Sequence, residues 1–250
     1  MKLTILGCGT SGGVPKIPEY WGACDPAEPK NRRQRASVFV EEGDTHILID
    51  TSPDLRSQIL TNKINKIDAV FYTHEHADHT HGIDELRGFH QATGAKIPMF
   101  ADAETMALLK SKFDYIFKGV RGYPSVGTGT AINGPKQVGQ IKMIPFEQGH
   151  GSGISLGYRF GDMAYSTDLN RMPETAFEAL QGVKIWVVDA LRYDPHPTHS
   201  HLAQTLEWIE QVKPDLAVLT HMTWDMDYQT LKRKLPSGVV PAYDGMVLEL

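Results

Sequence analysis

The chain has 250 residues, of which 41% are hydrophobic and 22% charged, and its formal net charge is −5. This composition is typical of a soluble globular protein with a full core, and it gives no general basic field for a large nucleic acid. Two cysteines exclude a disulfide framework and a zinc ribbon. No repeat or linker divides the sequence, so we expect a single domain over residues 1–250.

The sequence shows neither a membrane-spanning segment nor a signal peptide. No apolar stretch approaches the roughly 20 residues that cross a bilayer. The N-terminus runs directly into a strand pattern, without the features of a signal peptide. We therefore expect a cytoplasmic protein that has no membrane partner.

The predicted elements alternate between short apolar strands and helices with apolar residues at three- and four-residue spacing. The expected strands cover residues 3–6, 37–40, 46–49, 68–72, 141–146, 155–160, 163–166, 184–188 and 216–219. The expected helices cover residues 103–110, 173–180 and 201–212. This order predicts two sheets with helices outside them, an α/β architecture.

Residues 119–139 form the loosest segment, with six glycines and two prolines. A loop of this length in a compact domain is usually a lid or a binding loop. It contains just two basic residues, Arg121 and Lys136. We expect it to close over a small ligand.

A dense group of histidines follows the apolar run 68–72. The segment Thr73-His74-Glu75-His76-Ala77-Asp78-His79 holds three imidazoles and a free carboxylate. The i, i+2 spacing of His74 and His76 favours an extended loop, since helix neighbours are three or four residues apart. Imidazole and carboxylate together suit zinc, manganese or iron, and four such groups exceed what one catalytic ion usually takes. Two ions explain the pattern better than a solvated histidine-rich turn.

Further ligands are expected where other predicted strands end. His150 lies between glycines after the strand 141–146, Asp168 follows the strand 163–166, and His221 follows the strand 216–219. A carboxylate can bridge two cations through its two oxygens. Each of these residues alone is more often a capping or surface residue, and their recurrence at strand ends is what favours a metal site.

These motifs resemble the metallo-β-lactamase superfamily, whose H-x-H-x-D-H signature is similar to residues 74–79. The resemblance covers nearly the whole chain and implies a four-layer αββα metallo-β-lactamase sandwich. It implies one divalent ion (Zn or Mn) on His74, His76 and His150, a second on Asp78, His79 and His221, and Asp168 between them.

A narrower resemblance is carried by residues outside the ligand set. The segments 6–15, 21–22, 32–34, 48–50 and 243–246 are similar to the cyclic phosphodiesterases of bacterial carbon-phosphorus lyase operons, a sister group of the tRNA 3′-processing endonucleases. Known members carry a structural zinc after the Trp-Gly pair. Here Ala23, Asp25, Glu28 and Trp224 stand where its ligands would be, so we expect no structural ion.

The implied activity is hydrolysis of a small ribose cyclic phosphodiester by a hydroxide that bridges two metal ions. Asp78 is assigned to the catalytic centre as well as to the ligand set. The alkoxide leaving group needs a proton, and the resemblance favours His199 as its donor over a simple helix cap. His196 and His201 are candidates for orienting this acid or contacting the substrate.

Other polar residues receive supporting roles. Asp50 is expected to accept the N–H of a ligand histidine, and Ser152 is a further candidate for substrate contact. Arg32, Arg33 and Arg35 are interpreted as solvated surface or as phosphate contacts.

Three other functions remain open from the sequence: a tRNA 3′-processing endonuclease, a thioester or lactone hydrolase, and a nucleotide-binding sensor without activity. The acidic net charge and the presence of all seven expected ligands favour the phosphodiesterase. We expect a small phosphodiester or nucleotide-like partner and no large nucleic acid, and a homodimer is compatible with the sequence.

Overall fold

Fourteen strands form two seven-stranded mixed sheets in the computed structural model, which describes residues 1–250. The first sheet has the order β14-β1-β2-β3-β4-β5-β6. Its strands are β1 (Lys2–Gly7), β2 (Ser37–Glu42), β3 (Thr45–Ile49), β4 (Ala69–Phe71), β5 (Ile97–Ala101), β6 (Gly127–Ala131) and β14 (Val247–Glu249). Pairing is antiparallel from β14 to β3 and parallel from β3 to β6.

The second sheet, of order β13-β12-β11-β10-β9-β8-β7, has the same division into an antiparallel and a parallel half. Its strands are β7 (Lys136–Val138), β8 (Ile141–His150), β9 (Gly153–Phe160), β10 (Met163–Ser166), β11 (Ile185–Asp189), β12 (Leu216–Thr220) and β13 (Val239–Pro241). The strands β10 to β13 are parallel, and β7 to β10 are antiparallel.

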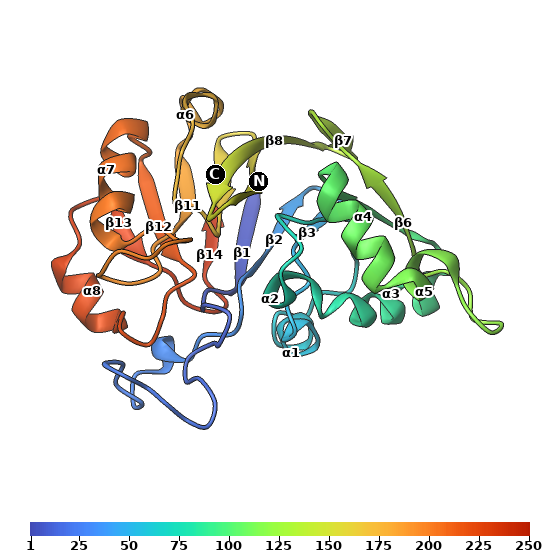
Figure 1. The fold of residues 1–250 in the computed structure, drawn as a ribbon, viewed down its shortest axis with the longest axis horizontal. Coiled ribbons are helices and arrows are strands. Elements are labelled where there is room, and N and C mark those ends of the chain that lie inside the picture. The colour runs from blue at the N-terminus through green and yellow to red at the C-terminus, as the bar shows by residue number, and fades with distance from the viewer.

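Helices lie on both sides of the two sheets (Figure 1). On the side of the first sheet are α1 (Leu55–Thr61), α2 (Ala77–Thr80), α3 (Leu86–Thr93), α4 (Ala103–Lys112) and α5 (Asp114–Lys118). On the other side are α6 (Glu174–Leu180), α7 (Leu202–Val212) and α8 (Tyr228–Lys234). The 3₁₀ turns are η1 (Pro29–Asn31) and η2 (Ile83–Glu85). Two sheets between helical layers form the expected αββα sandwich.

The side chains of a strand point alternately to the two faces of its sheet, and this explains why the first sheet lies between two apolar cores. On β2, Val38 and Val40 belong to a core of 39 buried residues that includes both sheets. Phe39 points to the opposite face, in a second core of 18 residues under α1, α3, α4 and α5. Successive side chains of a strand point to opposite faces, so the first sheet needs apolar residues on both sides. That requirement produces the continuous apolar run of β2.

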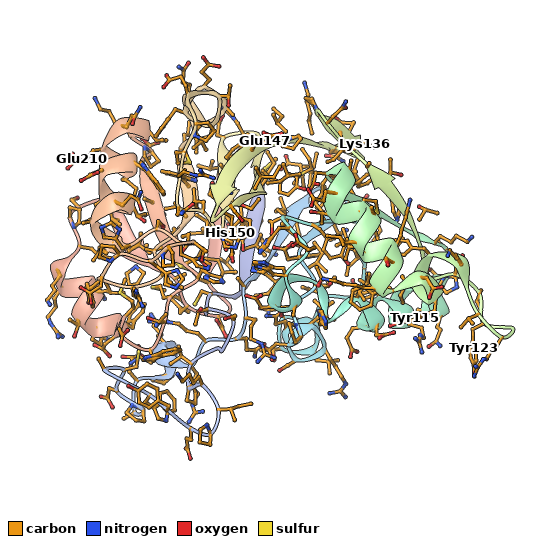
Figure 2. The ribbon with its side chains drawn as sticks, in the orientation of Figure 1. Tyr115, Tyr123, Lys136, Glu147, His150 and Glu210 are labelled. Atoms are coloured by element: carbon orange, nitrogen blue, oxygen red, sulfur yellow. The ribbon has the colours of Figure 1, made fainter.

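The segment 119–139 differs from the expected long loop. Its second part contains β6 and β7, and a Cβ on Gly127 would lie 2.5 Å from Met99 Cε. The glycines of β6 therefore allow close packing and do not indicate flexibility. Tyr123, in the remaining loop, lies at the far end of the molecule from His150 (Figure 2). The expectation that this loop closes over the site is wrong.

The helices α6 and α7 each begin one residue later than the sequence predicts. Pro173 and His201 are N-cap residues of α6 and α7 and lie outside the helices. The longest helix has 11 residues, and none combines the length and apolar character that a bilayer span requires.

Candidate metal centre

Polar residues collect at the carboxyl ends of the parallel strands, where both sheets meet one edge of the sandwich. Asp50 follows β3, His74 lies after β4, and Asp168 lies after β10. Asp189 ends β11 and His221 follows β12. Because the strands in each half are parallel, residues far apart in sequence reach the same edge.

The first group of possible ligands is His74, His76, His150 and Asp168, with all ligand atoms within 4.8 Å of one another. His150 Nε2 lies 3.4 Å from His76 Nδ1. The Oδ2 of Asp168 lies 3.5 Å from His74 Nε2 and 3.9 Å from His150 Nε2. His76 is the N-cap of α2, and its extended backbone turns its ring toward the same point as His74 and His150.

The second group is Asp78, His79, His221 and Asp168. His79 Nε2 lies 3.3 Å from Asp78 Oδ2 and 3.1 Å from Asp168 Oδ1. His221 Nε2 lies 3.5 Å from Asp78 Oδ2 and 3.2 Å from Asp168 Oδ1. Asp168 thus presents one oxygen to each group, in the grouping that the sequence resemblance implies.

These distances fit two cations. Ligand atoms held about 2.1 Å from one tetrahedral ion lie about 3.4 Å apart. The Nε2 atoms of His74, His79 and His221 are buried and have no hydrogen-bond partner in the protein. A buried polar atom without a partner costs free energy, so these three atoms need a ligand that the polypeptide does not supply. The cluster is a metal-binding one.

The backbone is strained at three of the strand ends. Asp50, Asp168 and His221 have φ angles of 63°, 53° and 57°, in the left-handed region. Residues other than glycine adopt this conformation rarely, and outliers of this kind concentrate at functional sites. The surrounding sheets hold the three side chains in place against that cost.

Two hydrogen bonds set the orientation of ligand rings. His79 Nδ1 donates to Asp50 Oδ2 at 2.8 Å, and His150 Nδ1 donates to the backbone oxygen of Thr198 at 2.8 Å. Each bond leaves the Nε2 lone pair of that ring facing the metal group. Asp50 is fully buried and also accepts from the backbone N–H and hydroxyl of Thr73.

Burial and neighbouring charges shift the pKa values of these side chains in opposite directions. Burial lowers the pKa of His74 well below its ordinary value and also lowers the pKa of His150, which favours the neutral, metal-binding imidazole. Burial alone would also lower the pKa of His79, but Asp168, Asp78 and Asp50 raise it well above the usual range. Burial tends to raise the pKa of Asp168, yet the neighbouring histidines hold it well below that of a free carboxyl.

His199 lies at the border of both groups. Its Nε2 is 3.7 Å from Asp168 Oδ2, and its ring stacks on His221 at 4.9 Å. Its Nδ1 lies 3.0 Å from Asp189 Oδ2, a partner that the sequence interpretation missed. Asp189 ends a predicted strand just as Asp168 does, so the same signal would have identified it. Burial tends to lower the pKa of His199, but Asp168 and Asp189 together raise it to about 9.

The remaining predicted residues lie farther out. His196 is 5.3 Å from the His199 ring, measured between ring centroids, and Thr198 donates its backbone N–H to His196 Nδ1. His201 pairs through its backbone with Arg192 and belongs to neither ligand group. Ser152 is exposed and lines a cavity of about 340 Å³ beside His76.

The chain belongs to the β-lactamase superfamily: the family model described as a beta-lactamase superfamily domain matches residues 45–222, which include every ligand named above. Within that superfamily it is similar to a diphosphatase from the PhnP family, with 39% identity and a TM-score of 0.93. The alignment covers 100% of this chain and 97% of that structure. The chain thus has the metallo-β-lactamase fold of this superfamily.

Two other relatives are more distant. The octanoyltransferase of Porphyromonas gingivalis is 30% identical over 257 residues, covering 98% of this chain. The chain spans about half, 51%, of the length of that curated relative. The short form of human tRNase Z has a TM-score of 0.71 at 16% identity, with 100% of this chain and 99% of that chain covered, which shows a shared fold.

Proposed function

We propose that the protein is a phosphodiesterase that uses two divalent ions, zinc or manganese, to hydrolyse a small cyclic phosphodiester of a ribose. One observation carries the proposal: His199 Nε2 lies 3.7 Å from the shared Asp168 while its Nδ1 is held by Asp189. An imidazole fixed in this way can deliver a proton next to a substrate on the metal groups. Alkoxide leaving groups need such a proton.

Seven residues of the chain form the two ligand groups. His74, His76 and His150 would hold one ion, Asp78, His79 and His221 would hold the other, and Asp168 belongs to both ligand groups. When bound, the two ions supply Lewis-acid stabilisation of phosphoryl oxygens and lower the pKa of water to near neutrality.

Proton transfer then depends on His199. Asp189 accepts a hydrogen bond from the Nδ1–H of His199. This bond leaves the Nε2–H of the imidazolium free to give its proton to the leaving oxygen, after which Nε2 carries a lone pair. Asp50 and the Thr198 carbonyl hold the ligand rings so that these distances persist.

The size and charge of the molecule favour a small substrate. The cavity beside His76, about 340 Å³, matches the lower range of small-molecule sites. The net charge of −5 offers no broad attraction to a polyanion such as precursor tRNA.

A second candidate is hydrolysis of a diphosphate linkage. The PhnP-family structure that is 39% identical to this chain is a diphosphatase. A phosphate leaving group is a weaker base than an alkoxide and needs less help from His199. Dependence on His199 therefore separates the two candidates.

A substrate panel tests the proposal. Metal-reconstituted protein is assayed with ribose cyclic phosphates, nucleoside cyclic phosphates, a diphosphate ester, a thioester, a lactone and precursor tRNA. We expect the highest kcat/KM on a ribose cyclic phosphate. A higher kcat/KM on the diphosphate ester, the thioester, the lactone or precursor tRNA than on every ribose or nucleoside cyclic phosphate would overturn the assignment, in favour of the corresponding activity.

A further inference from the structure

His199 lies on a segment that the two sheets do not hold through their backbones. It belongs to the loop between β11 and α7, and residues 194–199 make no backbone–backbone hydrogen bond. The bond from its Nδ1 to Asp189 holds the ring, while the backbone that carries the ring needs contacts of its own. A side chain that transfers a proton must stay within about 0.5 Å of its productive position, so other side chains have to fix this loop.

Side chains of other elements bind the two carbonyl groups directly before His199. His150 Nδ1 donates to the oxygen of Thr198 at 2.8 Å, and Asn170 Nδ2 donates to the oxygen of Pro197 at 2.6 Å. The first bond comes from a residue of the first ligand group. The second comes from a residue with no assigned role, which follows Asp168 by two positions.

The side-chain amide of Asn170 bridges two segments. Besides its bond to Pro197, its Oδ1 accepts from the backbone N–H of Gly151 at 3.2 Å. The reverse orientation of the amide would set NH₂ against N–H and C=O against C=O, so only this orientation satisfies both partners. The backbone of Asn170 is held as well, because its N–H donates to the oxygen of Gly149 at 2.8 Å and its oxygen accepts from Gln204 on α7 at 3.1 Å.

The turn between β8 and β9 gives this bridge a fixed support. Gly151 has a φ of 59°, and a Cβ there would lie 2.8 Å from Thr198 Cγ2, so glycine lets the turn and the loop approach closely. Arg171 Nη2 donates to the Gly151 oxygen at 3.1 Å and holds the turn from its other side. The same turn follows His150, which Figure 2 shows near the middle of the molecule.

We propose that Asn170 is a positioning residue for the general acid: its amide fixes the loop that carries His199 against the turn that follows His150. The distance between His199 and the two ligand groups is thereby set by a side chain that touches neither the metal groups nor the substrate. The inference rests on the proposed phosphodiesterase function, in which His199 gives the proton to the leaving group.

Asn170→Ala in metal-reconstituted protein is the first test. We expect the metal content of the wild type and a fall in kcat on a ribose cyclic phosphate of roughly 10- to 100-fold, since a small displacement of a reacting group is costly. KM should stay within about twofold, and kcat on a bis-aryl phosphate, whose leaving group needs little protonation, should fall by less than about threefold. Loss of metal, or equal losses on both substrates, would overturn the inference.

A double variant separates positioning of His199 from a general structural effect. If Asn170 acts through His199, then adding Asn170→Ala to His199→Ala should change turnover of the cyclic phosphate by less than about twofold. A residue that only stabilises the fold would lower turnover in both backgrounds alike. A further loss of about tenfold in the His199→Ala background would therefore overturn the inference.

Asn170→Asp separates the two bonds of the amide. It keeps an acceptor for the Gly151 N–H but presents an oxygen, in place of the donor, to the carbonyl of Pro197. Turnover of the cyclic phosphate should fall at least as far as in Asn170→Ala, and wild-type turnover would overturn the role of the Pro197 contact. The matched control is Asn133→Ala, at an exposed asparagine between β6 and β7, which should behave as the wild type.

A crystal structure of metal-free Asn170→Ala gives a readout that does not depend on turnover. We expect the His199 ring to be displaced by about 1 Å or more from its wild-type position, with His150 and Asp168 in place. An unmoved ring would overturn the inference, while hydrolysis of the cyclic phosphate by the wild type would still uphold the phosphodiesterase. Wild-type protein that holds metal and hydrolyses neither phosphodiester would overturn both.

Discussion

Two polar clusters with buried members differ in how many of their buried atoms have hydrogen-bond partners. At the metal centre, the Nε2 atoms of His74, His79 and His221 have none. In the second cluster, formed by Asn31, Arg33 and Asp227 and called here the arginine cluster, the side chains hydrogen-bond to one another and to the backbone.

The arginine cluster anchors the loop after the Trp-Gly pair, where we expect no structural zinc. Arg33 is 2% exposed and donates to the backbone oxygens of Thr223 and Met226, with only its Nε unpartnered. Asn31 donates to Asp227 Oδ2 at 2.7 Å and accepts from the backbone N–H of Tyr228. Several unpartnered ring nitrogens that face one another indicate a missing ligand, whereas a cluster whose members are mostly paired stabilises the fold without one.

The largest expected effect comes from breaking the shared ligand. Asp168→Ala should reduce metal content below the two ions per chain that we expect in the wild type, and should lower phosphodiesterase kcat/KM by roughly 10,000-fold, because both ligand groups use this carboxylate. Elemental analysis measures the metal content, and hydrolysis of a bis-aryl phosphate measures kcat/KM. Asp162→Ala, at a half-exposed aspartate just before β10 that pairs only with Lys184, is the matched control. Two retained ions in Asp168→Ala would contradict the shared role.

His199→Ala should have the next largest effect. We expect both ions to stay bound and turnover of substrates with alkyl leaving groups to fall by about 100- to 10,000-fold. Aryl leaving groups depart with less protonation and should lose less. The exposed His81→Ala should change neither rate. Because His199, Asp189, Asp168 and His221 also form a possible ligand group, loss of metal in His199→Ala would show that the ring is a ligand and not the acid.

The arginine cluster should respond in stability and not in metal content. Arg33→Met leaves the carbonyl oxygens of Thr223 and Met226 unpaired, so the free energy of unfolding should fall by about 2–4 kcal/mol. Denaturant unfolding measures this. The exposed Arg32→Met should stay within about 0.5 kcal/mol of the wild type. Release of a zinc ion by Arg33→Met would refute the view that hydrogen bonds alone hold this loop.

The smallest expected effect is a pH dependence at Asp227. Partial burial raises its pKa, but hydrogen bonds from Asn31 and Thr230 outweigh this and lower it to about 2. A carboxyl whose folded pKa lies below the unfolded value stabilises the fold above about pH 4, and this contribution is lost as pH falls through 2. Asp227 is only partly buried, so solvent screens these interactions and we expect at most about 1 kcal/mol. Unfolding curves at pH 4 and pH 2 should show Asp227→Asn and the wild type converging by this amount.

Local pattern was enough to predict much of the fold. Apolar runs and helical spacing predicted β10 (Met163–Ser166) to the residue and α4 and α7 nearly so. Short or amphipathic elements such as β14 and α8 were missed, since three residues of strand or seven of helix carry little periodic signal. The glycines of residues 119–139 led to a wrong prediction of a long loop. A closely packed strand and a flexible loop can both be rich in glycine, so composition does not separate them.

For the site, the sequence by itself determined which residue types follow which strands: the dense run His74 to His79, and single residues such as Asp168 and His221. The tertiary structure decided which atoms face one another. Two parallel half-sheets bring these strand ends to one edge, and Asp168 presents one oxygen to each ligand group. The pairing of Asp189 with His199 and the burial of Arg33 were also decided there, because hydrogen bonding between distant segments leaves no local pattern in the chain.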